Sequence, residues 1–457
     1  MCNSFIISII HHNFIRNYTA MKTPIIQSIR LLCLILPLGL NAQILSSNGA
    51  AIFISNGGQL HCNGGVELNN NSTLTNNGQL RTTKNAANIL AGTLSNNSLS
   101  SINGNGNYYV EQDWENNAIF TANSSSVYLY GNTEQLITST NGSITEFNNL
   151  ILQGNGTSAN RKKTLQNIDA RISATGNLRI NDRELATRTN SMIVLNPSTS
   201  AVTNSQLMNS EGFVSSLPPG FLSWSSNANS PYLFPVGSST GTIRYRPVVI
   251  EPKSSEANMY YVRLNNTTGD TYGYDLSQHD NDIEVLNSLF FHSIEQESGA
   301  NNADLSIAYL PSSDGDWSSI AQWNTASLLW NSIAPTNASN IGNYNALQKA
   351  NWDFTNPDHP YILVNLEDEL EIPNVFTPNQ DGANDFYLVT GKGIIEYNIV
   401  IINRWGNVVY ESNDINAAWD GTAKGNPCVE GVYFYNIKAK SITQEYNKQG
   451  HITLNNN

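Results

Sequence analysis

Short repeated segments rich in Asn and Gly constrain the fold of this chain more than any other feature. The segment Gly57-Gly58-Gln59-Leu60 recurs as Asn77-Gly78-Gln79-Leu80, twenty residues later, and Gly92-Thr93-Leu94 continues the pattern. Short alternating strands separated by Asn and Gly turns, with a period near twenty, are typical of a β-solenoid. In such a fold each coil hydrogen-bonds to its neighbours, and we expect stacked Asn side chains to form ladders along the axis. A series of ordinary β-hairpins is the alternative.

The composition of the chain also favours β structure. Charged residues make up 13% of the 457 residues, against about 25% in an ordinary globular protein. Amides and hydroxyls supply the polarity instead, and these side chains favour turns over helix interiors. We therefore predict an all-β fold. Its expected parts are a leader over 1–42, a β-solenoid-like region over 43–239, a β-sandwich with an acidic linker over 240–370, and an Ig-like β-sandwich over 371–457.

The charge balance argues against one class of partner. The formal net charge is −13, whereas binding to nucleic acid needs a concentrated basic face. The densest basic cluster is Arg161-Lys162-Lys163, in an expected loop. We therefore expect no nucleic-acid partner.

The first 42 residues resemble a secretory leader in their pattern. Met21-Lys22 and Arg30 precede an apolar run over 31–40, which is followed by Asn41-Ala42-Gln43. This order predicts a signal peptide cleaved after Ala42, with Met21 as an alternative translation start. The run is too short to span a bilayer, so we expect no transmembrane segment in the mature chain.

Two kinds of residue in the body of the chain have more than one interpretation. Cys62 and Cys428 remain after cleavage, and we expect two separate thiols; a disulfide between domains is the alternative. Four tryptophans between 317 and 352 are interpreted either as a sugar-stacking platform or as packing of the core. They are Trp317, Trp323, Trp330 and Trp352.

Four ordered blocks of residues mark the C-terminal region, beginning at Ile372. β-branched and aromatic runs alternate here with Asn, Asp and Gly turns, which predicts a small β domain. We expect the tryptophans of Trp405-Gly406 and Trp419-Asp420-Gly421 to anchor two turns on the core. The motif residues are Pro373, Asn374, Phe376, Thr377, Pro378, Asn379, Asp381, Gly382, Asn384, Asp385, Asn403, Arg404, Trp405, Gly406, Tyr410, Trp419, Asp420, Gly421, Gly431, Tyr433 and Tyr435.

These blocks resemble the gliding motility-associated C-terminal domain, which is the type B sorting domain of the type IX secretion system in Bacteroidetes. The resemblance implies export across the outer membrane to the cell surface or the medium, with the type IX secretion machinery as a partner. Two positions depart from the family pattern. Gln380 stands where the family commonly has Gly, and the last strand ends in Asn455-Asn456-Asn457 where a basic residue is common. The repeat-rich N-terminal region is similar to adhesin-like surface proteins.

Three carboxylates are the candidates for catalysis. Glu111, Asp113 and Glu115 alternate along the chain, so on one strand they share a face, with neighbours about 6.5–7 Å apart. Glycoside hydrolysis uses two carboxyl groups about 5–9.5 Å apart. The alternative is a solvated strand face without catalytic function.

A loop in the C-terminal region offers oxygen ligands for calcium. Asn379, Asp381 and Asp385 are the candidates, since alternating oxygen donors before a Gly are how a calcium loop begins. Asx turns, in which Asn and Asp side chains bind their own backbone, are the alternative.

Together these features predict a secreted or surface-displayed protein, adhesin-like or structural, that is not an enzyme. Surface glycans and host or environmental surfaces are the expected contacts, and calcium is the one cofactor considered. The alternative is an extracellular protein that binds or degrades polysaccharides.

Overall fold

The computed structural model describes residues 44–85, 92–354, 360–441 and 444–455. These residues are almost entirely β, which confirms the predicted all-β class. The helices among them are short: α1 Pro311–Asp314 and the 3-10 turns η1 Ser158–Arg161 and η2 Gly269–Tyr272. None of the helices described has the length and apolar character needed to cross a bilayer. The predicted leader over 1–42 lies outside the described residues.

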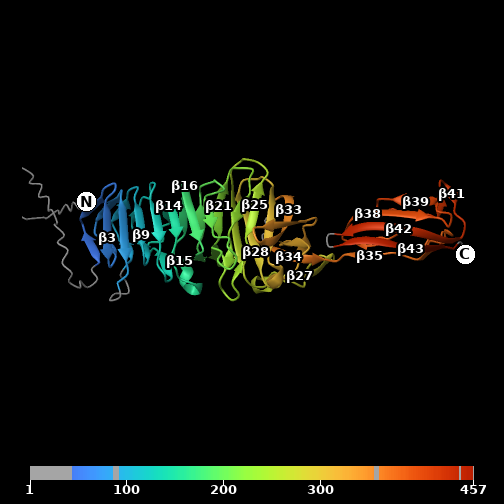
Figure 1. The fold of residues 1–457 in the computed structure, drawn as a ribbon, viewed down its shortest axis with the longest axis horizontal. Coiled ribbons are helices and arrows are strands. Elements are labelled where there is room, and N and C mark those ends of the chain that lie inside the picture. The colour runs from blue at the N-terminus through green and yellow to red at the C-terminus, as the bar shows by residue number, and fades with distance from the viewer. Residues whose placement is uncertain (1–43, 86–91, 355–359, 442–443, 456–457) are drawn as a thin grey trace, which may run out of the picture.

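The molecule is elongated, with a stack of strands at one end and a separate group of long strands at the other (Figure 1). From residue 45 to residue 226 the chain winds repeatedly through parallel sheets, and we call this region the parallel stack. The first sheet contains β1 Leu45–Asn48, β4 Val66–Asn69, β7 Leu94–Asn96, β10 Trp114–Asn116, β13 Gln135–Thr138, β15 Lys162–Gln166, β17 Glu184–Arg188 and β20 Phe213–Ser216. The second contains β2 Ala51–Ile54, β5 Thr73–Asn76, β8 Ser101–Asn103 and β11 Ile119–Phe120.

The third sheet completes each turn of the chain. It contains β3 Gln59–Asn63, β6 Gln79–Thr83, β9 Asn107–Val110, β12 Ser126–Leu129, β14 Thr145–Leu152, β16 Ala170–Asn181, β18 Met192–Val194 and β21 Leu222–Ser226, with β19 Val202–Asn204 beside β16. Up to β12 the chain visits the three sheets in rotation. From β13 onward the chain passes between the first and third sheets, with β18 and β19 both in the third, and the long strands β14 and β16 take the place of the short strands of the second.

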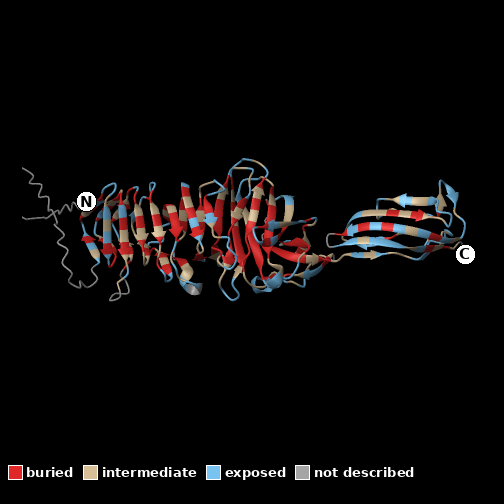
Figure 2. Ribbon diagram, viewed as in Figure 1, coloured by how far each residue is buried: buried red, intermediate tan, exposed pale blue. Residues whose placement is uncertain are grey.

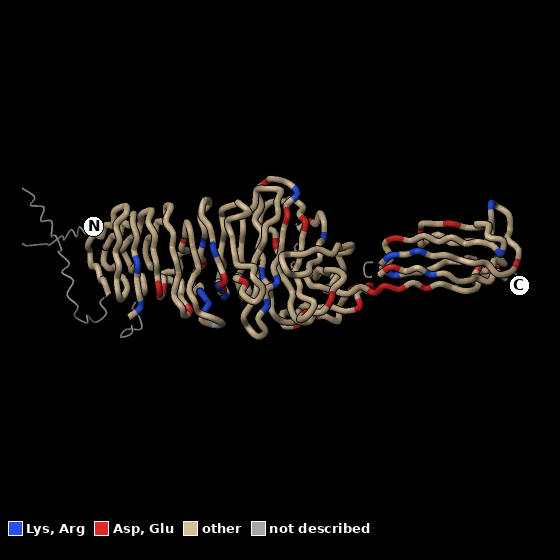
Figure 3. Tube along the Cα trace, in the orientation of Figure 1, with Lys and Arg blue, Asp and Glu red and all other residues tan. Residues whose placement is uncertain are grey.

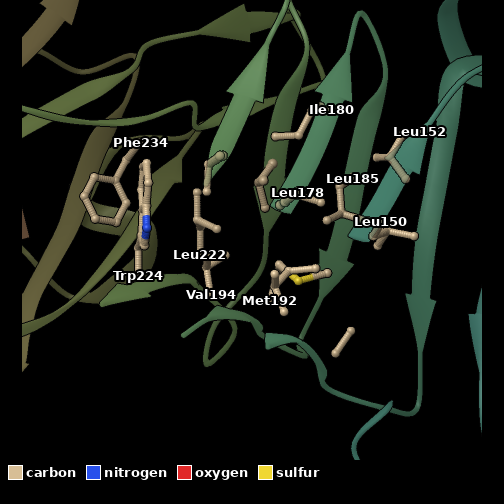
Figure 4. Close-up of a cluster of buried hydrophobic side chains, with 14 of the residues drawn as sticks. Leu150, Leu152, Leu178, Ile180, Leu185, Met192, Val194, Leu222, Trp224 and Phe234 are labelled. Atoms are coloured by element: carbon tan, nitrogen blue, oxygen red, sulfur yellow. The ribbon is translucent and has the colours of Figure 1, made fainter. Parts of the chain in front are cut away.

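The register of the third sheet builds a continuous core. The two copies of the repeat pair directly, with Leu60 beside Leu80. The column continues through Tyr108, Val127 and Leu150, all of them buried. Because side chains alternate along a strand, every second residue enters this core and the others face outward. Figure 2 marks the buried residues along the ribbon, and Figure 4 shows hydrophobic side chains of this interior.

Asn side chains form the predicted ladders between turns of the stack. The amide nitrogen of Asn97 donates to Asn69 Oδ1 at 2.9 Å, and that of Asn117 donates to Asn97 Oδ1 at 3.3 Å. Deeper inside, the buried Asn96 donates to Asn116 Oδ1 at 2.9 Å. The Asn side chains therefore pair with one another between successive turns of the stack. A buried amide without a partner would be costly there.

Close packing of successive turns explains one repeated glycine. A Cβ atom added to Gly78 would lie 2.2 Å from the carbonyl oxygen of Gly58, in the preceding copy of the repeat. No side chain fits at that distance, so the repeat requires glycine where its turns touch.

At β21 the third sheet changes from parallel to antiparallel pairing. It continues through β26 Asn258–Asn265, β28 Phe291–Ser298, β34 Pro360–Leu366, β30 Ser319–Asn324 and β31 Leu329–Ser332, with β27 Ile283–Leu286 beside β34. A second antiparallel sheet contains β22 Tyr232–Phe234, β25 Val248–Pro252, β29 Ala303–Tyr309, β33 Tyr344–Trp352 and β32 Asn337–Ile341, and β23 Gly237–Ser238 pairs with β24 Arg244–Tyr245. One hydrophobic cluster runs from Ile52 to Leu363, so both regions share a core.

The C-terminal strands form a unit with its own core, from Phe376 to Leu454. Its main sheet has the order β36 Val375–Phe376, β43 Glu445–Leu454, β42 Gly431–Ser441, β38 Ile394–Ile402 and β39 Val408–Ser412. Two short pairs accompany it: β35 Glu369–Glu371 with β37 Thr390–Lys392, and β40 Thr422–Ala423 with β41 Asn426–Pro427. The predicted acidic linker thus includes β35, a strand of this unit, and the junction appears as a red segment in Figure 3. Cys62 and Cys428, one in each unit, are free thiols.

Candidate functional site

An aromatic cluster holds the interior of the C-terminal unit. The rings of Phe376 and Trp419 lie 5.1 Å apart, and those of Trp419 and Tyr433 lie 5.2 Å apart. Trp419 is buried, and its indole N–H donates to the carbonyl oxygen of Thr422 at 2.8 Å. Aromatic contacts of this kind add to the burial of apolar area. The prediction that Trp419 anchors a turn on the core is therefore confirmed.

The second tryptophan of the motifs lies in the opposite environment. Trp405 is 81% exposed, in the hairpin turn between β38 and β39. Asn403 Oδ1 accepts the backbone N–H groups of Trp405 and Asn407, both at 3.0 Å, and Gly406 has a φ of +81°. The prediction that Trp405 packs on the core is wrong, because its turn extends beyond Ile401, the last buried residue of β38.

Other apolar side chains are exposed on the outer face of the main sheet, near the same turn. Val432 and Phe434 alternate with the buried Tyr433 along β42, so they face away from the core. Phe434 pairs with Ile402, which pairs with Val408 on β39. At the other side Val432 pairs with Thr453, which pairs with Val375.

We call this group the distal apolar face, because it lies at the end of the sheet farthest from β35 (Figure 1). Its members are Val375, Ile402, Trp405, Val408, Val432 and Phe434. Farther along the same strands, the outward positions of β42 and β43 are polar, with Lys438 beside Asn447 and Lys440 beside Glu445. The apolar residues are thus concentrated at one end of the face.

The candidate calcium loop folds around its own backbone. The Asp385 carboxylate accepts the N–H groups of Gln380 at 2.6 Å and Gly382 at 2.9 Å. Asp381 Oδ1 accepts the N–H of Ala383 at 2.8 Å, and Asn379 Oδ1 accepts that of Asp381 at 3.1 Å. The bonds to Asp381 and Asn379, each from the N–H two residues further on, have the geometry of the Asx-turn alternative. No group of three or more His, Cys, Asp or Glu that could hold a metal occurs in the described residues.

Comparison with known proteins assigns the C-terminal unit. Residues 370–454 match the CHU_C type IX secretion signal domain. The matched segment begins within β35 and ends with β43, so it includes the aromatic cluster and the distal apolar face. The signal domain indicates export by type IX secretion to the cell surface or beyond, and interaction with the secretion machinery. No curated protein and no solved structure matches the chain.

Sequence reasoning missed most of the distal apolar face of the signal domain. The motif residues Tyr433 and Tyr435 were singled out, whereas Val432 and Phe434, which alternate with them, were not. Polar and apolar residues alternate in the sequence only over 436–440, whereas 432–435 is a continuous apolar run, so the sequence does not show which of these four residues face outward. Which of the two faces is buried depends on packing against other strands, and the sequence of β42 alone does not determine it.

The three carboxylate candidates lie outside the signal domain and do not share a strand face. β9 ends at Val110 and β10 begins at Trp114, so a corner separates Glu111 from Glu115. Each carboxylate binds a neighbouring turn of the stack. Glu111 accepts the N–H of Lys84 at 2.5 Å, Asp113 accepts that of Leu136 at 2.8 Å, and Glu115 accepts the hydroxyl of Ser95 at 2.6 Å.

The surroundings of Asp113 alter its ionisation. Burial raises the pKa of the Asp113 carboxyl, and the N–H of Leu136 acts in the opposite direction. The hydrogen bonds of all three residues tie successive turns together. The catalytic interpretation stays a prediction.

The tryptophans of the middle region divide by burial. Trp323 and Trp330 are buried, with ring centroids 5.4 Å apart, as the core alternative describes. Trp317 and Trp352 are half-buried, and their indole N–H groups donate to the Asp314 carbonyl oxygen at 3.1 Å and to the Tyr361 hydroxyl at 2.9 Å. None of the four presents a fully open ring to solvent.

Proposed function

We propose that this chain is an adhesin-like or structural protein of the cell surface, with a β-solenoid stalk that the signal domain delivers to the exterior. The match over 370–454 is the observation that supports export. Support for the solenoid comes from the in-register parallel pairing that links β1 to β20 and β3 to β21. Each turn of such a stack contacts its neighbours, which makes an extended and stiff rod.

We infer further that the distal apolar face is where the signal domain contacts the secretion machinery. The aromatic cluster around Trp419 is buried and is not available to a partner in the folded domain. Trp405 and Phe434 are exposed, at 81% and 45%. Tryptophan and other aromatics are enriched where protein interfaces concentrate their binding energy. The expected partner surface is therefore apolar.

The first experiment tests whether the signal domain is required for export. The full chain and a chain lacking residues 371–457 are expressed in a bacterium that has a type IX secretion system, and cells are fractionated. The full chain is expected outside the cell, and the truncated chain in the periplasm. Fusion of 371–457 to an unrelated passenger is expected to export that passenger. Unchanged export of the truncated chain would contradict the proposal.

The second experiment tests the distal apolar face. The double variant Trp405→Ser, Phe434→Ser is expected to lower the exported fraction at least about tenfold, the effect of about 1.4 kcal/mol of binding. Phe386→Ser is the matched control, because Phe386 is 61% exposed in the same domain but lies outside the five-stranded sheet. Circular dichroism checks that both variants fold. Equal export of the double variant and the control would exclude this face as the contact.

A further inference from the structure

The outer face of the third parallel sheet carries no carboxylate over six strand segments that pair in register along the stack. The segments are 59–63, 79–83, 107–110, 126–129, 149–152 and 177–180. They contain two arginines and neither Asp nor Glu, in a chain whose formal net charge is −13. Strands of the first sheet, in contrast, carry Glu67, Glu115 and Glu184. We call the outward side chains of the six segments the carboxylate-free face.

One row of side chains runs along this face in the direction of the stack. The register places Arg81, Tyr109, Tyr128, Ile151 and Arg179 on successive strands. The rings of Tyr109 and Tyr128 are stacked, with centroids 4.5 Å apart and an interplanar angle of 14°. The guanidinium of Arg81 lies over the Tyr109 ring, 4.5 Å from its centroid. Flat aromatic and cationic groups therefore follow one another along the axis, and their mutual contacts hold them in place.

A second row of side chains supplies amide and hydroxyl groups beside the first. Its members are Gln59, Gln79, Asn107, Ser126, Asn149 and Asn177. Asn177 donates to Asn149 Oδ1 at 3.2 Å, and Asn149 donates to the Ser126 hydroxyl at 3.2 Å. Each amide has two N–H donors and an oxygen that accepts two hydrogen bonds, which is more than these contacts use. The face thus offers donors and acceptors at intervals of about 4.8 Å, the spacing of the strands.

The two arginines of the face have no carboxylate partner. Neither Arg81 nor Arg179 forms an ion pair in the part of the chain that the structure describes. The arginines that do form ion pairs there are Arg171, Arg183, Arg244 and Arg246. Arg179 is exposed, and Arg81 is half-buried between tyrosine rings. Two guanidinium groups without counter-charges on a face without carboxylates are complementary to an anionic ligand.

The spacing of these charges indicates the class of ligand. Arg81 and Arg179 are four strand spacings apart, roughly 19 Å. A nucleic acid carries a phosphate on every nucleotide, so binding to it needs a much denser set of cations. Between the two arginines the face presents amides and tyrosines, which exchange hydrogen bonds with hydroxyl groups. A polymer with many hydroxyls and intermittent carboxylates matches this pattern, and an arginine can bind a carboxylate through two parallel hydrogen bonds.

We propose that the carboxylate-free face binds an extended acidic polysaccharide that lies along the axis of the stack. Its carboxylates contact Arg81 and Arg179, and its hydroxyls contact the row of amides. This ligand deepens the proposed surface role, and it rests on that role only for access of the stack to the exterior. The experiment uses the purified chain, so a failure to bind and a failure of export are separate results.

Isothermal titration calorimetry on the full chain measures the binding. The probes are alginate, polygalacturonate and hyaluronate, with dextran as a neutral polysaccharide and single-stranded DNA as a denser polyanion. At least one acidic polysaccharide is expected to bind at least about tenfold more tightly than dextran and DNA. Arg179→Gln is expected to weaken this binding at least about fivefold, because hydrogen bonds between charged groups are strong.

Two further variants make the result decisive. Arg171→Gln is the matched control, because Arg171 lies on the same strand β16 and loses the same charge, but it is paired with Glu146 at 2.8 Å outside the six segments. Gln79→Glu places a carboxylate at an exposed position of the face and is expected to weaken binding even if Arg179→Gln fails to fold. Circular dichroism checks that each variant folds.

Four results would overturn the proposal. The first is that no acidic polysaccharide binds, and the second is that dextran or DNA binds as tightly. The third is that Gln79→Glu or a folded Arg179→Gln binds as well as the native chain. The fourth is that Arg171→Gln weakens binding as much as Arg179→Gln, because the loss would then reflect net charge and not this face.

Discussion

Replacing Gln380 with Gly is expected to stabilise the signal domain. Gln380 has a φ of +65°, in the left-handed region, and its side chain is exposed. Its backbone N–H is held by the Asp385 carboxylate at 2.6 Å, so the loop fixes this conformation. The substitution therefore removes backbone strain and loses no buried contact. This is the position where the family resemblance leads one to expect Gly.

The size of the effect follows from two opposing terms. A residue with a Cβ atom costs about 1–2 kcal/mol in the left-handed conformation. Gly loses about 0.5–1 kcal/mol more backbone entropy on folding. The difference is a stabilisation of about 0.5–1 kcal/mol, which slows amide exchange through local opening about two- to fivefold.

Hydrogen exchange with mass spectrometry on the full chain measures this change. Peptides from 370–390 should exchange more slowly in Gln380→Gly, and peptides from the parallel stack serve as the internal reference. Gln380→Ala keeps the Cβ atom and should give no such gain. Gly382→Ala should have the opposite effect, because Gly382 has a φ of +89° and open space around an added Cβ, so only strain is introduced. If Gln380→Ala slows exchange as much as Gln380→Gly, the strain argument is wrong.

Two further predictions concern the body of the chain. Asn96→Ala should lower the free energy of unfolding by about 1–3 kcal/mol in urea titrations, because it removes a buried bond to Asn116 Oδ1 at 2.9 Å, which leaves that acceptor without its donor, and a further bond to the Ile119 carbonyl oxygen at 3.0 Å. Burial lowers the pKa of His292 to about 4, and its Nε2–H donates to the Arg246 carbonyl oxygen at 2.9 Å. The unfolded state then binds the extra proton first, so stability should fall as pH drops from about 6.5 toward 4. Titrations at several pH values should show this dependence reduced in His292→Gln.

The sequence predicted the structural features that follow from its short repeats. The repeat of Gln59-Leu60 and Gln79-Leu80 anticipated which residues pair, and the Asn content anticipated the ladders. It did not predict the replacement of the short second sheet by β14 and β16. That change depends on an irregular register between Phe147 and Asn149, which a strand pattern does not reveal.

The three candidate carboxylates show the same limit of prediction from the sequence. Alternation places Glu111, Asp113 and Glu115 on one face only if the strand continues through them. The chain turns after Val110, and the three side chains then bind different neighbours. The contacts of Glu184 could not be predicted either, because Lys162, Glu184 and Ser215 come together only through the register of three stacked strands.

The two motif tryptophans show why a motif does not by itself assign a role. Trp405 and Trp419 each lie within two residues of a turn glycine, so the local sequence does not distinguish them. Trp419 exchanges backbone hydrogen bonds with Tyr387 in an isolated bridge, which holds this segment against the core, and its ring is buried. Trp405 lies beyond the last buried position of β38, in the hairpin turn, and is 81% exposed. A large apolar ring that a hairpin holds in solvent does not contribute to the core. Exposure of this ring to water is unfavourable, and a partner that covers the ring would offset that free energy. The export assay of Trp405→Ser, Phe434→Ser measures how much the exposed aromatic rings contribute to export.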